Sequence, residues 1–193
     1  AGLPVTTVEQ VTGAPEMLEH RVVTLHPKIH GGILADLHKE THRADLERHG
    51  IEPFALVVSN LYPFLERPDI ETIDVGGPTM VRAAAKNHAH VGIVTSPEQY
   101  DGVLAELRAN DGALSDATRR ALALEAFAHT AAYDAAISAW FAEALGDEAP
   151  KRRAFAGELV QTMRYGENPH QKAAFYKFAN PRTGVATATQ LQG

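Results

Sequence analysis

The sequence contains no cysteine, which excludes disulfide bonds, thiolate metal sites and a cysteine nucleophile and fits a reducing compartment. It also lacks any apolar run near the ~20 residues that a membrane span requires. Its first residues do not show the charged stretch and apolar core of a secretory signal. The formal net charge is −6, which argues against a general nucleic-acid-binding protein. We therefore expect neither a membrane nor a nucleic acid as a partner.

The composition is that of an ordinary globular protein. The chain has 193 residues, of which 45% are hydrophobic and 22% charged, enough for one good domain. Ten histidines are many for this length. The sequence begins at Ala1 without a methionine and ends as abruptly at Gly193. We expect it to be a piece of a longer protein.

Two continuous apolar, β-branched runs predict buried strands of a parallel sheet. They are Phe54–Leu61 and Val91–Thr95. The alanine-rich segment Pro78–Asn87 between them predicts a helix. Because strands that alternate with helices are typical of layered domains, the expected fold class is α/β, with a parallel sheet flanked by helices.

Further elements are expected on both sides of this unit. Val5–Val8 predicts a short strand and Pro15–His20 a short helix, and Gly50 is a helix stop signal. Pro97–Ala109 predicts an amphipathic helix, and Ser115 is a suitable N-cap for a longer one.

A polar stretch with a proline, GDEAPKRR at residues 146–153, predicts a linker. We therefore expect a first domain over residues 1–146, a linker over 147–158 and the opening segment of a second domain over 159–193. That last segment is too short for a fold of its own.

A glycine-rich turn is the first candidate ligand site. In Asp74–Met80, two glycines permit a close backbone approach, and Pro78 suits the first turn of a helix. The N-terminus of that helix would offer N–H donors to an anion. Arg82 and Lys86, four residues apart, share one helix face. The alternative is a tight turn followed by a solvated basic face.

Histidines dominate the second candidate segment, Arg21–Gly32. A metal site would pair His26 with His30, at the i, i+4 spacing of a helix. Pro27 and the glycine pair that ends the segment argue against a regular helix, and no acidic residue completes a metal-binding pattern. We expect no metal site, and favour a loop of backbone amides around a phosphorylated ligand.

Two more segments carry polar side chains where a ligand would bind. Ser59 and Asn60 lie at the carboxyl end of the first predicted strand, although such residues also simply turn into solvent. The run Arg164–Gln171 is dense in functional side chains and has no periodicity, so packing does not explain it. Its alternative is an exposed loop.

Together, the runs TLHPKIHGGIL, NLYPF, IDVGGPTMVRAAAKNH and RYGENPHQKAAFY resemble the bifunctional purine-biosynthesis family. That family joins an inosine monophosphate (IMP) cyclohydrolase to an aminoimidazole carboxamide ribonucleotide (AICAR) transformylase. The resemblance implies a methylglyoxal-synthase-like fold and closure of formyl-AICAR to IMP with loss of water, without a metal or redox cofactor. It also implies 10-formyltetrahydrofolate as co-substrate of the transformylase, a cytoplasmic location and a homodimer.

The resemblance also assigns site residues. It gives Lys86 a role in acid–base catalysis and places Tyr62 and Asp74 at the same reacting centre. The positions that it implies for nucleotide binding are Arg21, Val22, Val23, Thr24, Ser59, Asn60, Asp74 and Val75, and those that it implies for AICAR contact in the transformylase are Arg164 and Tyr165.

The chain departs from the family pattern in four ways. Val23 stands where the family has a lysine that helps to organise the reacting centre. The segment from Phe64 to Ile73 is shorter than usual, the first strand with its phosphate loops is absent, and only the opening of the transformylase is present. Val23 and the missing loops favour an alternative, a non-catalytic nucleotide- or phosphate-binding module on the same fold. A helical interaction scaffold over residues 115–145 is a weaker one, since it explains none of the motifs.

Overall fold

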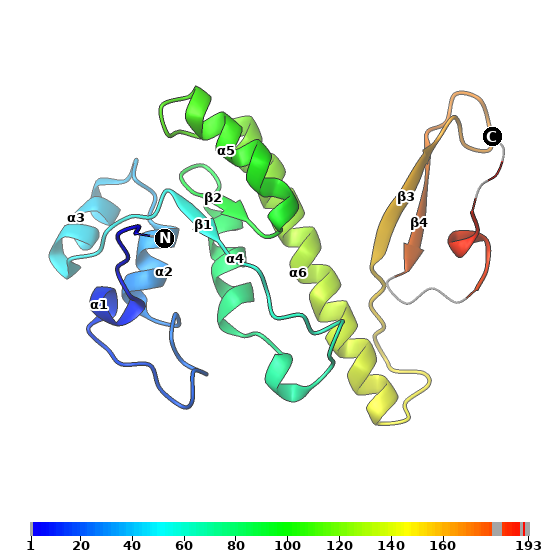
Figure 1. Cartoon of the computed structure of the whole chain (residues 1–193), viewed down its shortest axis with the longest axis horizontal. Helices are drawn as coiled ribbons and strands as arrows, with labels where there is room; N and C mark the ends of the chain where they lie inside the picture. Colours follow the sequence, from blue (N-terminus) through cyan, green and yellow to red (C-terminus); the bar gives the residue numbers. More distant parts are fainter. Residues whose placement is uncertain (1, 179–182, 190, 192–193) are drawn as a thin grey trace. The chain divides into compact units, whose positions relative to one another are not determined.

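Two short parallel strands lie at the centre of the first part of the chain (Figure 1). Strand β1 (Leu56–Val58) pairs with β2 (Gly92–Val94), with Val57 opposite Ile93. Helix α4 (Gly76–Lys86) connects the two strands in sequence and packs against both. The predicted α/β class with a small parallel sheet is therefore confirmed, and each strand occupies the middle of the run that predicted it.

The computed structural model describes residues 2–178, 183–189 and 191. The chain divides into two units, residues 1–130 and 131–193. None of the described helices is long and apolar enough to cross a membrane. Besides α4, the helices are α1 (Val8–Thr12), α2 (Pro27–Leu34), α3 (Glu40–His49), α5 (Tyr100–Ala109) and α6 (Asp116–Ala144), and the 3₁₀ turns are η1 (Ile70–Thr72), η2 (Pro97–Gln99) and η3 (Val185–Thr187).

The core of the first unit lies between the strands and the helices around them. Ile93 of β2 and Val81 of α4 are fully buried, and each such side chain contributes roughly 1.5–3 kcal/mol through its removal from water. Leu122 and Ala126, from the first half of α6, belong to the same apolar cluster, as does Val103 of α5. The sheet is thus held by apolar contacts with α4, α5 and the first half of α6.

Several predicted helix ends are confirmed. Gly50 follows α3 with a φ of 59°, the left-handed conformation that glycine adopts without strain. The hydroxyl of Ser115 accepts a hydrogen bond from the Thr118 N–H at 3.2 Å and so caps α6. The segment predicted as one helix over 97–109 is the short turn η2 continued directly by α5.

Two predictions near the N-terminus are wrong. Residues 5–8 form no strand, because Thr7 instead caps α1 in a reciprocal capping box with Gln10. Residues 15–20 form no helix, since Leu18, Glu19 and His20 all have positive φ angles, which a right-handed helix does not allow. The chain turns there, and Met17 pairs with Val22 in an antiparallel bridge.

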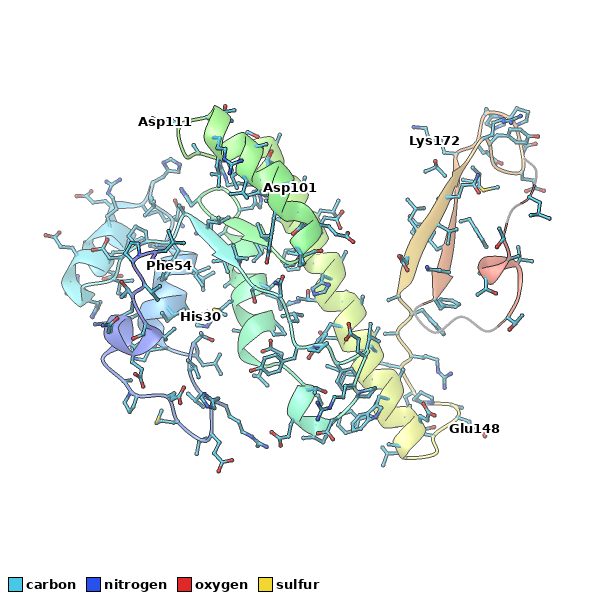
Figure 2. The ribbon with its side chains drawn as sticks, viewed as in Figure 1. His30, Phe54, Asp101, Asp111, Glu148 and Lys172 are labelled. Atoms are coloured by element: carbon cyan, nitrogen blue, oxygen red, sulfur yellow. The ribbon has the colours of Figure 1, made fainter. Side chains whose placement is uncertain are left out.

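The prediction that Pro27 disrupts a helix is also wrong. Pro27 is the first residue of α2, where its fixed φ suits the helix and its missing N–H is not needed. The glycines 31 and 32 lie inside this helix. A Cβ atom on Gly32 would lie 2.5 Å from the backbone oxygen of Glu52 and 2.8 Å from the Phe54 ring, which Figure 2 labels beside α2. Close packing therefore accounts for this glycine, which the sequence had suggested as part of a phosphate loop.

We expect Gly32→Ala to lower the free energy of unfolding by about 2 kcal/mol or more, because backbone cannot move aside as a side-chain end can. Gly102→Ala is the matched control, since Gly102 lies in α5 and a Cβ there would meet nothing within 4 Å. The control should gain up to about 1 kcal/mol from helix propensity. Urea unfolding followed by circular dichroism measures both, and equal stabilities would contradict the packing argument.

The second unit contains an antiparallel hairpin. Strand β3 (Gly157–Met163) pairs with β4 (Ala173–Phe178), with Gly157 opposite Phe178 and an irregularity in the register after Leu159. Strand β3 thus begins inside the segment predicted as a linker, 147–158. Within the predicted second domain, residues 179–182, 190, 192 and 193 lie outside the described residues.

Candidate functional site

A cavity of about 800 Å³ lies beside the carboxyl end of β1, the edge of a parallel sheet at which ligands bind in α/β folds. Four segments line it: the loop before α2, the residues that follow β1, the turn η1 and the first turn of α4. The predicted site residues among the lining are Arg21, Val23, Thr24, Ser59, Asn60, Tyr62, Asp74 and Val75. Residues as far apart in sequence as Glu16 and Met80 therefore meet at one place.

The end of β1 is anchored to the neighbouring strand. The Ser59 N–H donates to the Val94 carbonyl at 2.9 Å, and Ser59 is buried. Asn60 follows on the exposed side, and its Nδ2 donates to the Tyr100 hydroxyl at 2.9 Å. Tyr62 is 53% exposed on the rim of the cavity, so a ligand can reach its hydroxyl.

Asp74 is fixed at the start of α4. Its Oδ1 accepts a hydrogen bond from the Gly77 N–H at 2.8 Å, so this donor, expected to serve an anion, already has a carboxylate partner. A Cβ on Gly77 would collide with the Asp74 carboxylate and with Leu61, and one on Gly76 would lie 2.9 Å from the Thr24 hydroxyl. The glycine pair thus lets the carboxylate and the loop before α2 approach the helix closely.

Arg21 forms an ion pair with Glu71 of η1. Both side chains are about two-thirds exposed, so the pair contributes little to stability and can separate. Glu71 was missed by the sequence reasoning. The signal that could have found its place is the capping box of Asp69 and Thr72, which holds η1 at the cavity edge.

The two neighbouring valines of the loop before α2, Val22 and Val23, have different positions relative to the cavity. Val23 is half-buried and lines the cavity. Val22 does not line it, and exchanges backbone hydrogen bonds with Met17 at 3.0 and 3.2 Å. Val22 therefore shapes the loop through its backbone.

Lys86 lies apart from the other residues assigned to the reacting centre. It is the last residue of α4 and is exposed. Ten residues separate it from Gly76, about 15 Å along a helix, and it is not part of the cavity lining. Arg82, one turn earlier, lies over the Phe127 ring with 5.6 Å between the guanidinium carbon and the ring centroid. The structure of the first unit does not bring Lys86 to Asp74.

Several histidines have structural positions. His26 caps α2, with its Nδ1 accepting from the Lys28 N–H at 3.1 Å. His42 accepts from the Asp36 N–H at 3.0 Å, and His90 Nε2 lies 3.1 Å from Asp36 Oδ1. The His38 N–H and the His90 ring favour the charged carboxylate, so the pKa of Asp36 is lowered.

His30 sits within α2, and Figure 2 labels it there. Its Nε2 is buried without a hydrogen-bond partner among the described residues. Burial lowers the pKa of His30 below its usual value, which favours the neutral ring. Over the described part of the chain, no three histidine or acidic side chains are grouped closely enough to hold a metal ion.

Arg164 and Tyr165 belong to the second unit. They begin the loop between β3 and β4, which is closed by a hydrogen bond from the Gly166 N–H to the Gln171 carbonyl at 2.8 Å. The Gln171 side chain also accepts from the Asn168 N–H at 2.9 Å. Both predicted contact residues are exposed, and the loop that carries them is internally ordered by these bonds.

Comparisons with known proteins agree with the family resemblance. A family model described as "AICARFT/IMPCHase bienzyme" matches residues 84–193. The chain is 58% identical over its whole length to a protein of Cereibacter sphaeroides named bifunctional purine biosynthesis protein PurH. Proteins with the same name from Ruegeria pomeroyi and Bartonella bacilliformis are 57% and 54% identical, again over the whole chain. The chain spans 37–38% of the length of these relatives.

A solved structure supports the arrangement of the elements. The crystal structure of ForH matches with a TM-score of 0.65 and 37% sequence identity, covering 72% of this chain and 77% of the other. At this level of identity and overlap, the two chains share their fold over most of their length.

Proposed function

Since the chain belongs to the AICARFT/IMPCHase bienzyme family, we propose that its first unit contributes the cyclohydrolase site, which closes formyl-AICAR to IMP with loss of water. The observation that carries this proposal is the cavity, which gathers Ser59, Asn60, Tyr62, Asp74 and the loop before α2. These are the positions to which the family resemblance assigns the nucleotide and the reacting centre.

The chemistry of ring closure fits this set of side chains. The carboxamide nitrogen is a poor nucleophile and must attack the formyl carbon, after which water leaves. The Asp74 carboxylate, oriented by the Gly77 N–H, can accept the amide proton, and the Tyr62 hydroxyl can donate to the oxygen of the formyl group. Because both reacting groups belong to one molecule, a cavity that holds a single conformer supplies much of the acceleration. No oxidation state changes, so the reaction needs no redox cofactor.

The whole protein is proposed to carry the second activity as well. In it, Arg164 and Tyr165 would contact AICAR while 10-formyltetrahydrofolate supplies the formyl group. We also propose the methylglyoxal-synthase-like type of α/β fold for the first domain, the boundaries 1–146, 147–158 and 159–193, a homodimer and a cytoplasmic location. These proposals rest on the family to which the chain belongs.

The decisive measurement is turnover by the full-length protein. Purified enzyme given formyl-AICAR should produce IMP, detected by chromatography and by its ultraviolet absorbance. Binding of IMP without any turnover would instead support the non-catalytic nucleotide-binding module.

We expect Val23→Lys to raise the cyclisation rate about tenfold. Val23 is half-buried at the cavity wall, so a lysine there can point its ammonium group into the open cavity and stabilise the developing oxyanion. Val23→Met is the control, because it adds length without charge. Steady-state kinetics and thermal unfolding test the change; a stable variant with unchanged turnover would show that this position does not limit the rate.

Glu71→Gln is expected to tighten IMP binding about two- to fivefold, because it releases Arg21 from its exposed ion pair to meet the phosphate. Glu98→Gln is the control. It removes the same charge from η2, outside the cavity lining. Calorimetric titration with IMP at low and high salt measures the effect. Equal gains from both variants would mean that only the net charge matters.

A further inference from the structure

The lining of the cavity is poor in positive charge. Four of its described residues carry carboxylates: Glu16, Glu19, Glu71 and Asp74. Two of them can carry a positive charge, Arg21 and His20, and the Arg21 guanidinium is already paired with Glu71. A nucleotide phosphate brings up to two further negative charges near neutral pH. The charge of His20 therefore has a large share in the electrostatic balance between the cavity and such a ligand.

His20 belongs to a strained turn at the cavity edge. Leu18, Glu19 and His20 have positive φ angles of 55°, 54° and 73°, a conformation that costs free energy in residues other than glycine. The turn is closed by the Arg21 N–H, which donates to the Leu18 carbonyl at 3.2 Å, and by the antiparallel bridge at its base. Strained residues of this kind cluster at ligand sites, and both Glu19 and His20 line the cavity.

The Glu16 carboxylate determines which nitrogen of His20 carries a proton. His20 Nδ1 lies 2.8 Å from Glu16 Oε2. A carboxylate only accepts hydrogen bonds, so Nδ1 is the donor in the neutral ring as well as in the charged one. His20 Nε2 has no hydrogen-bond partner among the described residues, and the side chain is 73% exposed. A second proton, which histidine takes up in the range between about pH 8 and pH 5, must therefore go to Nε2.

We propose that protonated His20 supplies the second positive charge of the cavity and binds the phosphate of the ligand through its Nε2–H. A hydrogen bond between two charged groups is stronger than one between neutral groups, so His20 should contribute more to affinity as the pH falls. The other charged residues around the turn are Glu9, Glu16, Glu19, Arg21, Glu71 and Asp74. Among these residue types and histidine, histidine is the one that ordinarily changes charge between about pH 5 and pH 8. This inference rests on the proposed function, because it takes the ligand to be a phosphorylated nucleotide.

The test measures IMP binding by full-length protein, by calorimetry at low salt and at about pH 6 and pH 8. A phosphate also titrates near pH 6, so the parent protein and a variant are compared at each pH. His20→Asn removes the titrating ring and keeps a residue type that tolerates positive φ. We expect the parent to bind IMP about two- to fivefold more tightly than His20→Asn at about pH 6, and within about 1.5-fold of it at about pH 8. His49→Asn, at the exposed end of α3 and outside the cavity lining, is the matched control and should equal the parent at both.

A third variant separates the charge of His20 from the shape of the turn. His20→Lys keeps a positive charge at both pH values, so it should bind IMP about two- to fivefold more tightly than the parent at about pH 8. A parent protein that does not bind IMP at either pH would overturn the proposed function and this inference with it. A parent that binds IMP, with the same ratio to His20→Asn at both pH values, would overturn the role of His20 alone. So would a His20→Lys variant that gains nothing at about pH 8, or a His49→Asn variant that behaves like His20→Asn.

Discussion

Replacing Asp74 by asparagine should lower the rate of ring closure by about 10²–10⁴-fold, the usual loss when a proton acceptor is removed from a reacting centre. Asparagine keeps an oxygen that can accept the Gly77 N–H, which Asp74 Oδ1 accepts at 2.8 Å. The start of α4 should therefore stay in place, and IMP should bind within about threefold of the parent protein. Single-turnover kinetics measure the rate, and calorimetry measures the binding.

The control for this change is Asp69→Asn. Asp69 also caps a turn through a backbone N–H, that of Glu71 at 2.9 Å, and it is exposed. It is not part of the cavity lining, so its loss of charge should leave turnover near the parent value. Near-normal turnover of Asp74→Asn would remove Asp74 from the chemistry and leave it as a helix cap.

A loss of similar size, about 10²–10⁴-fold, is expected for Lys86→Ala in the full-length protein. The family resemblance gives this lysine the acid–base role, and removing it should affect the chemical step with little change in IMP binding. Lys151→Ala, an exposed lysine outside the cavity, is the matched control. If Lys86→Ala keeps its turnover, the Tyr62 hydroxyl, which lines the cavity, remains as the proton donor and Lys86 has no part in the chemical step.

The position of Lys86 raises the question of whether it acts at a site of its own chain or of a second subunit. It lies about 15 Å along α4 from the cavity end of the helix, so we expect it to act at a site completed by a second copy of the chain. An equal mixture of Asp74→Asn and Lys86→Ala subunits should then recover about a quarter of the parent activity, because about half of its dimers are mixed and only one of the two sites in each mixed dimer is intact. Without recovery, Lys86 acts within its own chain.

Elements with continuous apolar runs could be predicted from the sequence, although β2 is buried over its whole length whereas Val58 of β1 is 54% exposed. The strands around Val57 and Ile93 and the helix between them are examples. The start of α2 could not be predicted in the same way, because a proline reads equally well as a helix breaker and as a first residue. The reason for Gly32 lies in Glu52 and Phe54, which are 20 and 22 residues away and meet it only in the folded chain.

The candidate site could be predicted where a polar residue stands at the end of a predicted strand or at the start of a predicted helix. Ser59 and Asn60 follow a strand, and Asp74 precedes a helix, so their meeting at one sheet edge follows from the topology. Glu71 and Tyr100 were missed because their partners, Arg21 and Asn60, are far away in sequence. Side-chain pairs of this kind depend on the final packing and leave no periodic trace.

The hairpin of the second unit has a consequence for the making of the protein. Tyr176 and Phe178 share one face of β4, with Leu159 opposite Tyr176, and all three are at least half exposed. Such an exposed apolar surface promotes non-specific association until another part of the protein or a second subunit covers it. When this hairpin has just emerged from the ribosome, we therefore expect chaperones to bind the nascent chain. Cells that overproduce the protein should accumulate aggregates of newly made chains. Tyr176→Lys adds a charge to this face and should reduce the amount of aggregate that forms during synthesis.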